Sequence, residues 1–388
     1  MAPLRGTNTC SLDFQYIINR GARRTLRLSS PQAVVLVIFY LRSLSELAKS
    51  IHEQIVALMC AFEMNVVAVR CLLHQGLTLK EETELLKQLG PGISYHLALL
   101  FVTESSPGGG WWHTSEHGNQ HKSQISESSF LEQCRYYVRH ISKDAVTCRI
   151  FGTACGMNLQ GPTTIQDICS CLIPTRFLSL VLPTATNLMM SDYSHILPEI
   201  FLNIYYFGSP LRSSCNRVWG RSVDARYHTG LLFIDRATPQ EQFLVTKILH
   251  APPQHRPYGL TLPDCSSICG CTSGQPKWTY KTEKQHRKEF IYIYISSCRH
   301  VDLRVAVYPS RRRIVERFGT QFVEEDWDKE KRQFHFDEPT MVRMLVQPGH
   351  TAAPLTLKES DKPWTIAGRR AAKQPESQTT QVDSTRAR

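Results

Sequence analysis

The chain of 388 residues is 42% hydrophobic and 20% charged, which excludes a wholly disordered or fibrous protein and allows a large domain with an appendage. Its 45 basic and 34 acidic residues give a net charge of +11, which permits a nucleic-acid or anionic partner without specifying one. The longest apolar runs, at residues 34–40 and 97–102, are too short to cross a membrane.

The cysteine content indicates the compartment. The sequence has 13 cysteines, and its first residues lack the apolar stretch of a signal peptide. An odd number of cysteines without a secretory signal favours a reducing compartment, the cytoplasm or nucleus, with free or metal-bound thiols. Residues 1–30 are rich in arginine and are expected to form a basic, disordered leader.

Apolar strand patterns alternate with amphipathic helix patterns between residues 31 and 230. The expected strands are residues 32–40, 65–72, 95–102, 145–153 and 176–182. The expected helices are residues 43–62, 78–89, 127–141, 164–172 and 193–218. This alternation predicts an α/β domain: a three-layer sandwich whose mostly parallel sheet is covered on both faces.

The pattern changes after residue 230. Short strand patterns at 231–234, 243–248, 290–296 and 301–308, interrupted by clustered cysteines, predict a small β-rich module over residues 231–345. Residues 346–388 are polar and basic with no hydrophobic period, so a disordered basic tail is expected there.

A histidine and a cysteine follow two successive strands. His117 precedes a glycine in the loop after the third strand, and Cys155 follows the fourth strand directly. Parallel strands end at the same edge of a sheet, so the two side chains are expected to meet there. An imidazole can convert a neighbouring thiol into the nucleophilic thiolate, and the main chain at Gly156 can hold an oxyanion.

This order of strand, His-Gly, helix, strand and Ala-Cys resembles the caspase-like fold of the clan CD cysteine peptidases, which includes metacaspases, separase and CHAT domains. The resemblance covers roughly residues 31–230 and implies a thiol endopeptidase, with His117 as the base and Cys155 as the nucleophile, acting on a protein or peptide. Two features depart from the family: Thr153 stands where caspases have glutamine, and a stretch rich in glycine and tryptophan separates His117 from its strand.

Other interpretations of these residues stay open. His113 and His121 lie in the same loop as His117, and any of the three can be the partner of Cys155. If Cys155 only ends a core strand, the chain is instead a catalytically inactive interaction protein on the same scaffold. The polar segment 224–230 either borders the site or ends a helix that Gly230 caps.

A second cysteine cluster has the layout of a zinc ribbon. Cys265, Cys269 and Cys271 lie in one turn, and Cys298 and His300 follow after a hairpin-sized segment. We expect a structural zinc ion held by Cys265, one or both of Cys269 and Cys271, Cys298 and His300. The alternatives are a cysteine-rich loop without metal, or a ribbon that binds nucleic acid through a basic surface.

Overall fold

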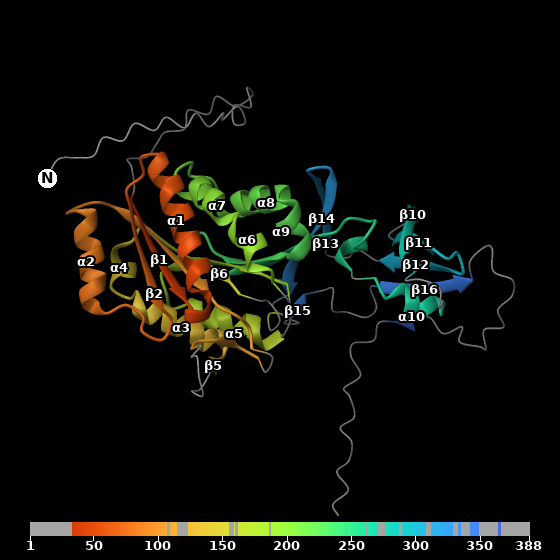
Figure 1. The fold of residues 1–388 in the computed structure, drawn as a ribbon, viewed down its shortest axis with the longest axis horizontal. Helices are drawn as coiled ribbons and strands as arrows, with labels where there is room; N and C mark the ends of the chain where they lie inside the picture. Colours follow the sequence, from red (N-terminus) through yellow and green to blue (C-terminus); the bar gives the residue numbers. More distant parts are fainter. Residues whose placement is uncertain are drawn as a thin grey trace, which may run out of the picture.

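The computed structural model describes a large and a small β-sheet, a two-stranded hairpin and the helices around the large sheet (Figure 1). The described residues are 33–106, 109–114, 123–154, 159, 162–185, 188–260, 262–270, 276–286, 289–307, 312–328, 333–334, 342–348 and 364–365. The expected leader, residues 1–30, and most of the expected tail, residues 346–388, lie outside this range.

Five parallel strands form one end of the large sheet. Their spatial order, starting from the edge of the sheet, is β2 (Val66–Leu72), β1 (Ala33–Tyr40), β3 (Tyr95–Val102), β6 (Thr147–Thr153) and β7 (Phe177–Pro183). Antiparallel strands continue it in the order β8 (Leu231–Asp235), β9 (Leu244–His250), β14 (Thr320–Asp328) and β13 (Arg312–Arg317), and β15 (Gln333–Phe334) pairs with β14. The predicted α/β class with a parallel core is confirmed.

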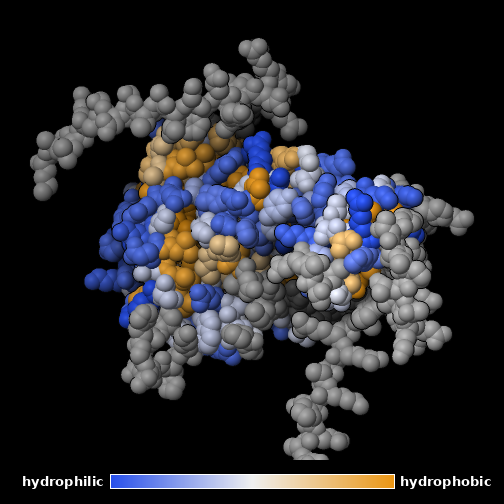
Figure 2. All heavy atoms as spheres, turned by 45° about the vertical axis from the view of Figure 1, so that its right-hand side comes forward, coloured by the Kyte–Doolittle hydropathy of each residue, from blue (hydrophilic) through white to orange (hydrophobic). Residues whose placement is uncertain are grey.

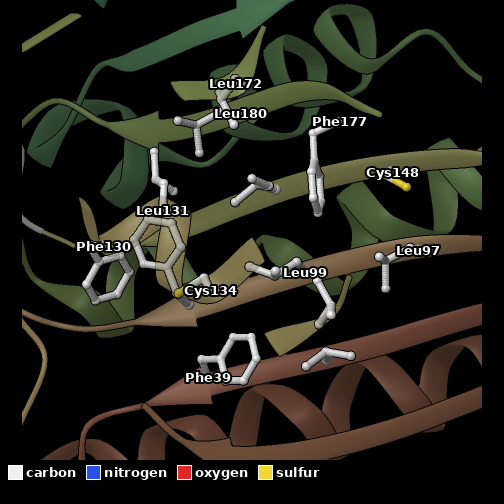
Figure 3. Close-up of a cluster of buried hydrophobic side chains, with 14 of the residues drawn as sticks. Phe39, Leu97, Leu99, Phe130, Leu131, Cys134, Cys148, Leu172, Phe177 and Leu180 are labelled. Carbon is white, nitrogen blue, oxygen red and sulfur yellow. The ribbon is translucent and has the colours of Figure 1, made fainter. Parts of the chain in front are cut away.

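Helices cover both faces of this sheet, which makes three layers (Figure 1). One face carries α1 (Ser45–Ala61), α6 (Met190–Ser194), α7 (Leu197–Tyr205), α8 (Leu211–Arg221) and α9 (Val223–His228). The other carries α2 (Leu79–Leu89), α3 (Glu127–Tyr137), α4 (Ile141–Asp144) and α5 (Pro162–Leu172). Figure 3 shows the second of these cores, where Phe39, Leu99 and Phe130 point toward one another from β1, β3 and α3.

Local sequence explains the first of these elements. Every residue of β1 except Tyr40 is buried, as its unbroken apolar run requires for a strand covered on both faces. Helix α2 begins with a capping box, in which the Thr78 hydroxyl accepts from the Glu81 amide and the Glu81 carboxylate accepts from the Thr78 amide. For β1 and α2, residues close together in the sequence are thus sufficient to explain the type of element and, for α2, where it begins.

The strand order reverses at β1, and this reversal locates the functional edge. Strands β2 and β3 pair with opposite sides of β1, so the connections through α1 and α2 diverge there. Open α/β sheets bind ligands in the crevice at the carboxyl ends of the strands beside such a reversal. The carboxyl ends of β1, β3 and β6 are therefore the part of the sheet to examine for a site.

Three segments differ in detail from the sequence expectations. The single helical region expected over 193–218 is divided into α6, α7 and α8, because Gly208 with φ +62° and Pro210 separate α7 from α8. The helix expected over 127–141 ends at Tyr137 and is followed by the short α4. The loop after β3 contains a small hairpin of β4 (Trp111–Trp112) and β5 (Gln124–Ile125).

The large sheet continues beyond residue 230, where the sequence places the start of the β-rich module. Strand β8 pairs with β7, β9 pairs with β8 and β14 pairs with β9, all in antiparallel orientation. The module itself is a small antiparallel sheet of β10 (Trp278–His286), β11 (Glu289–Ser296), β12 (Val301–Val307), β16 (Val342–Pro348) and β17 (Trp364–Thr365). Its apolar face packs with Val323 of β14.

The surface view in Figure 2 shows a largely hydrophilic face with separate hydrophobic patches. Among the residues that the structure describes, no helix is both long and apolar enough to span a bilayer. The short segments that complete the described fold are η1 (Arg42–Leu44), η3 (Pro257–Gly259) and α10 (Cys265–Cys269).

A half-buried histidine of β3, beside β6, makes the fold sensitive to acid. The His96 ring lies 2.7 Å from the Thr147 hydroxyl, and burial together with Arg149 lowers the pKa of His96 from 6.5 to about 4. Below pH 6.5 the unfolded chain therefore binds up to about one more proton at this residue than the folded chain does. We expect the free energy of unfolding to fall as the pH is lowered from about 6.5 to about 4.

Urea denaturation at several pH values measures this effect. His96→Gln, which cannot titrate in this range, is expected to reduce the loss of stability between pH 6.5 and 4. His255→Gln serves as the control because its side chain is exposed, and it should leave the slope nearly unchanged. An unaltered slope in His96→Gln contradicts the assignment.

Candidate functional site

Strands β3 and β6 are neighbours in the sheet and run parallel. Their register pairs Leu99 with Ile150 and Val102 with Thr153, so the two strands end level with each other. The prediction that these strand ends meet at one edge is confirmed. His117, Cys155 and Gly156 lie outside the described residues, and the structure gives no distance between them.

The loop after β3 is fastened to the core near its start. Trp111 is buried and its indole lies 4.9 Å from the ring of Phe101 and 5.2 Å from that of Phe130, measured between ring centroids. The Thr103 hydroxyl donates to the Trp112 carbonyl, which closes the loop back onto the strand end. The start of the loop is thus fixed to the core, which the sequence patterns did not indicate.

A glycine makes this hairpin possible. Gly110 has φ +75°, and a Cβ at this position would collide with the backbone of Ile125 in the opposite strand. Only glycine accommodates both this backbone conformation and this close approach. The glycine-rich stretch that separates His117 from its strand therefore has a structural purpose.

His113, the first histidine of the loop, is buried and turns toward β2. Burial lowers the pKa of His113, a hydrogen bond to the backbone of Leu73 opposes that effect, and His74 lowers the pKa further. Leu73 and His74 follow β2, which lies on the side of β3 away from β6. The residues around His113 therefore lie near the end of β2, whereas β6, which leads to Cys155, lies on the other side of β3.

The described residues on both sides of Cys155 pack in the same core. Ala154 and Leu159 are buried there, and the Thr153 carbonyl accepts a hydrogen bond of 3.0 Å from the Thr103 amide. Strand β6 therefore ends in a fixed position directly before Cys155 in sequence.

Two buried polar side chains at this edge were not expected from the sequence. Glu127 opens α3, whose amino terminus lies at the carboxyl edge because α3 connects the end of β3 to the start of β6. Its Oε1 and the buried Thr153 hydroxyl have no hydrogen-bond partner within the described part of the chain. Buried polar atoms are normally paired, so these two favour a polar ligand or ordered water at the edge. Glu127 has the pattern of an exposed first-turn acid, and no local signal indicates its burial.

The polar segment 224–230 borders the same edge from the opposite face of the sheet. The His228 imidazole lies 3.1 Å from the Asp192 carboxylate, and the Thr229 hydroxyl accepts from the amides of Thr184 and Ala185 just after β7. Thr229, rather than Gly230, is the residue that ends α9. The segment therefore both ends a helix and fixes the loop that follows β7.

Several cysteines of the large domain are packing residues. Burial raises the pKa of the Cys71 and Cys148 thiols to about 12 and that of Cys171 to about 11, and it raises the pKa of Cys134 and Cys215 still further. Thiols with such pKa values carry almost no thiolate at neutral pH and are poor nucleophiles.

The second cysteine cluster is assembled in part. Cys265 is buried, and burial, the neighbouring thiols of Cys269 and Cys298 and a hydrogen bond with Cys269 raise its pKa to about 12. His300 is exposed and is not among the groups that influence Cys265. Cys271 lies outside the described residues. Among the described residues, no group of three or more histidine, cysteine, aspartate or glutamate side chains is placed to hold a metal ion. The predicted zinc site therefore remains a prediction.

Comparison with known proteins adds no family name to this geometry. No model of a known protein family matches the chain, and no curated protein has a similar sequence. The site is therefore interpreted from its residues alone.

Close packing at Gly152, near the end of β6, provides a test of the edge geometry. A Cβ added at Gly152 would collide with the side chains of Phe101 and Leu182. We expect Gly152→Ala to lower the free energy of unfolding by roughly 1–3 kcal/mol, as overpacking in a filled core does.

Urea denaturation of both variants makes the comparison. Val146→Ala is the control, because Val146 is 49% exposed just before the same strand and should change stability by no more than about 0.5 kcal/mol. If Gly152→Ala is as stable as the control, β3, β6 and β7 are not packed as described.

Proposed function

We propose that residues 31–230 form a caspase-like domain and that the protein is a thiol endopeptidase with Cys155 as its nucleophile. The observation that supports this most directly is the parallel pairing of β3 with β6, because the chain leaves β3 toward His117 and leaves β6 toward Cys155 from one sheet edge. The reversal of strand order at β1 is compatible with a site at that edge.

His117 is the proposed base. The neighbourhood of His113 lies on the far side of β3 from β6, which favours a histidine farther along the loop. The loop that contains His117 begins at Trp111, which packs on Phe101, and returns through β5, which pairs with β4. His117 follows this fixed start of the loop in sequence, which supports its choice as the base.

The proposed reaction begins when the His117 imidazole takes the proton from the Cys155 thiol. The thiolate attacks a peptide carbonyl, and the Gly156 amide donates to the oxyanion that forms. The tetrahedral intermediate then breaks its C–N bond, and the imidazolium gives its proton to the leaving amine. Water, deprotonated by the same imidazole, hydrolyses the thioester and restores the Cys155 thiol.

The reactivity of individual cysteines tests this proposal before any substrate is known. In the full-length protein treated briefly with iodoacetamide, Cys155 should be alkylated faster than the exposed Cys60, as measured by peptide mass spectrometry. His117→Ala should slow the alkylation of Cys155 by roughly tenfold or more and leave that of Cys60 unchanged, because only Cys155 depends on the imidazole.

His113→Ala is the matched control within the same loop and should affect Cys155 much less. Cys155→Ala should abolish cleavage of a mixed peptide library while lowering stability by no more than about 1–2 kcal/mol. If Cys155 is alkylated no faster than Cys60, and its alkylation rate is unchanged in His117→Ala, the catalytic proposal is wrong. The remaining interpretation is then an inactive interaction protein on the same scaffold, or a nucleic-acid binder whose affinity falls steeply with salt.

A further inference from the structure

Three neighbouring strands place polar side chains side by side on one face of the large sheet. Arg149 of β6 pairs in register with Ser179 of β7, and Ser179 pairs with Asp235 of β8. Residues paired in this way project from the same face of a sheet, and so do residues two positions apart along a strand. Two positions along these strands lie members of the apolar cluster beneath α7 and α8, namely Phe151, Val181 and Phe233. The three polar side chains therefore lie on the face that α7 and α8 cover (Figure 1).

A β-bulge in β7 creates this arrangement. The pairing of β6 with β7 skips Leu178, because Cys148 pairs with the residue before it and Arg149 with the residue after it. With an unbroken register, Leu178 would be the neighbour of Arg149. The bulge brings the Ser179 hydroxyl beside the guanidinium instead, and bulges are frequent next to functional sites.

Two hydroxyl groups near Arg149 are buried without a partner. The Tyr205 ring of α7 lies over this part of β6, with its centroid 5.8 Å from Cζ of Arg149. Tyr205 is 8% exposed and Ser179 is 2% exposed, and neither hydroxyl has a hydrogen-bond partner in the described part of the chain. Because buried hydroxyls are normally hydrogen-bonded, these two favour a polar ligand or ordered water between α7 and the sheet.

The cluster also carries a positive charge without a counter-ion. The Arg149 side chain is half-buried, and its Nη1 donates to the Thr147 hydroxyl at 2.7 Å. Among the residues that the structure describes, no carboxylate forms an ion pair with Arg149. The Asp235 carboxylate accepts instead from Nε and Nη2 of Arg212, at 3.1 and 2.7 Å. The charge that remains on Arg149 favours an anion as the ligand.

The first turn of α8 adds to the positive field. No side chain caps the amino terminus of α8, and its first turn contains no acidic residue. The unpaired backbone amides and the dipole of a helix favour an anion at this end. The ion pair between Arg212, in this first turn, and Asp235 holds the helix end beside the polar row.

We propose that this polar cluster binds one inorganic phosphate ion between the sheet and helices α7 and α8. The donors are the side chains of Arg149, Arg212, Ser179 and Tyr205. Guanidinium and hydroxyl groups are the donors from which phosphate oxygens accept hydrogen bonds. Because these side chains are half to fully buried, the site suits a small anion rather than a nucleic-acid strand. It lies near the amino-terminal ends of β6 and β7, opposite to the edge that leads to Cys155, and is independent of the proposed peptidase activity.

Isothermal titration calorimetry of the full-length protein with sodium phosphate, at constant ionic strength, tests the proposal. The unmodified protein should bind phosphate saturably at a single site. Arg149→Gln should weaken binding by roughly tenfold or more, because it removes charge-assisted hydrogen bonds. Arg42→Gln is the matched control, since Arg42 is exposed just after β1 at the other end of the strands, and it should bind phosphate with unchanged affinity.

Tyr205→Phe separates phosphate binding from a purely structural role. It removes only a buried hydroxyl that has no partner, so without phosphate the variant should be at least as stable as the unmodified protein. It should nevertheless bind phosphate more weakly and show a smaller rise in Tm when phosphate is added. The absence of saturable binding would overturn the proposal. So would an equal rise in Tm in the unmodified protein, Arg149→Gln and Tyr205→Phe, because a salt that is merely excluded from the protein surface stabilises all three alike.

Discussion

The parallel pairing of β3 with β6 is the constraint on which the rest of the large domain depends. Strand β3 joins the β1–β2 half of the sheet to the β6–β7 half, so its register sets the position of every later strand. Gly152 permits this packing, because the rings of Phe101 and the side chain of Leu182 occupy the space where any larger side chain would have its Cβ. The same packing ends two strands level with each other and creates the edge at which a site can be built.

Short-range patterns were sufficient for the elements of this sheet and insufficient for the long-range parts. The apolar run of β1 and the capping box at Thr78 are local, and the structure agrees closely with both. Nothing local indicates that β14, about seventy residues beyond β9, returns to pair with it, since register between distant strands is a tertiary property. The domain boundary expected at residue 230 reflects this limit.

For the candidate site too, some features follow from local sequence patterns and others depend on tertiary packing. Alternation of strands and helices was enough to predict that the chain after β3 and the chain after β6 leave one edge, because topology alone decides it. Glu127 is buried, and Trp111 of the hairpin packs against Phe101 of β3 and Phe130 of α3. Such packing between separate elements cannot be predicted from the hydrophobic periodicity of the sequence.

Strand β14 connects the two sheets while keeping them energetically distinct. It pairs with β9 in the large sheet, and its Val323 lies in the apolar cluster of the small sheet. Loosening the small sheet would therefore expose one side of β14. It would leave the pairing of β3 with β6 intact, since β9, β8 and β7 intervene and the two faces of the large sheet have their own buried clusters. The small sheet thus supports the antiparallel end of the large sheet, whereas the β3–β6 edge is held by its own backbone pairing and by the buried clusters on the two faces of the large sheet.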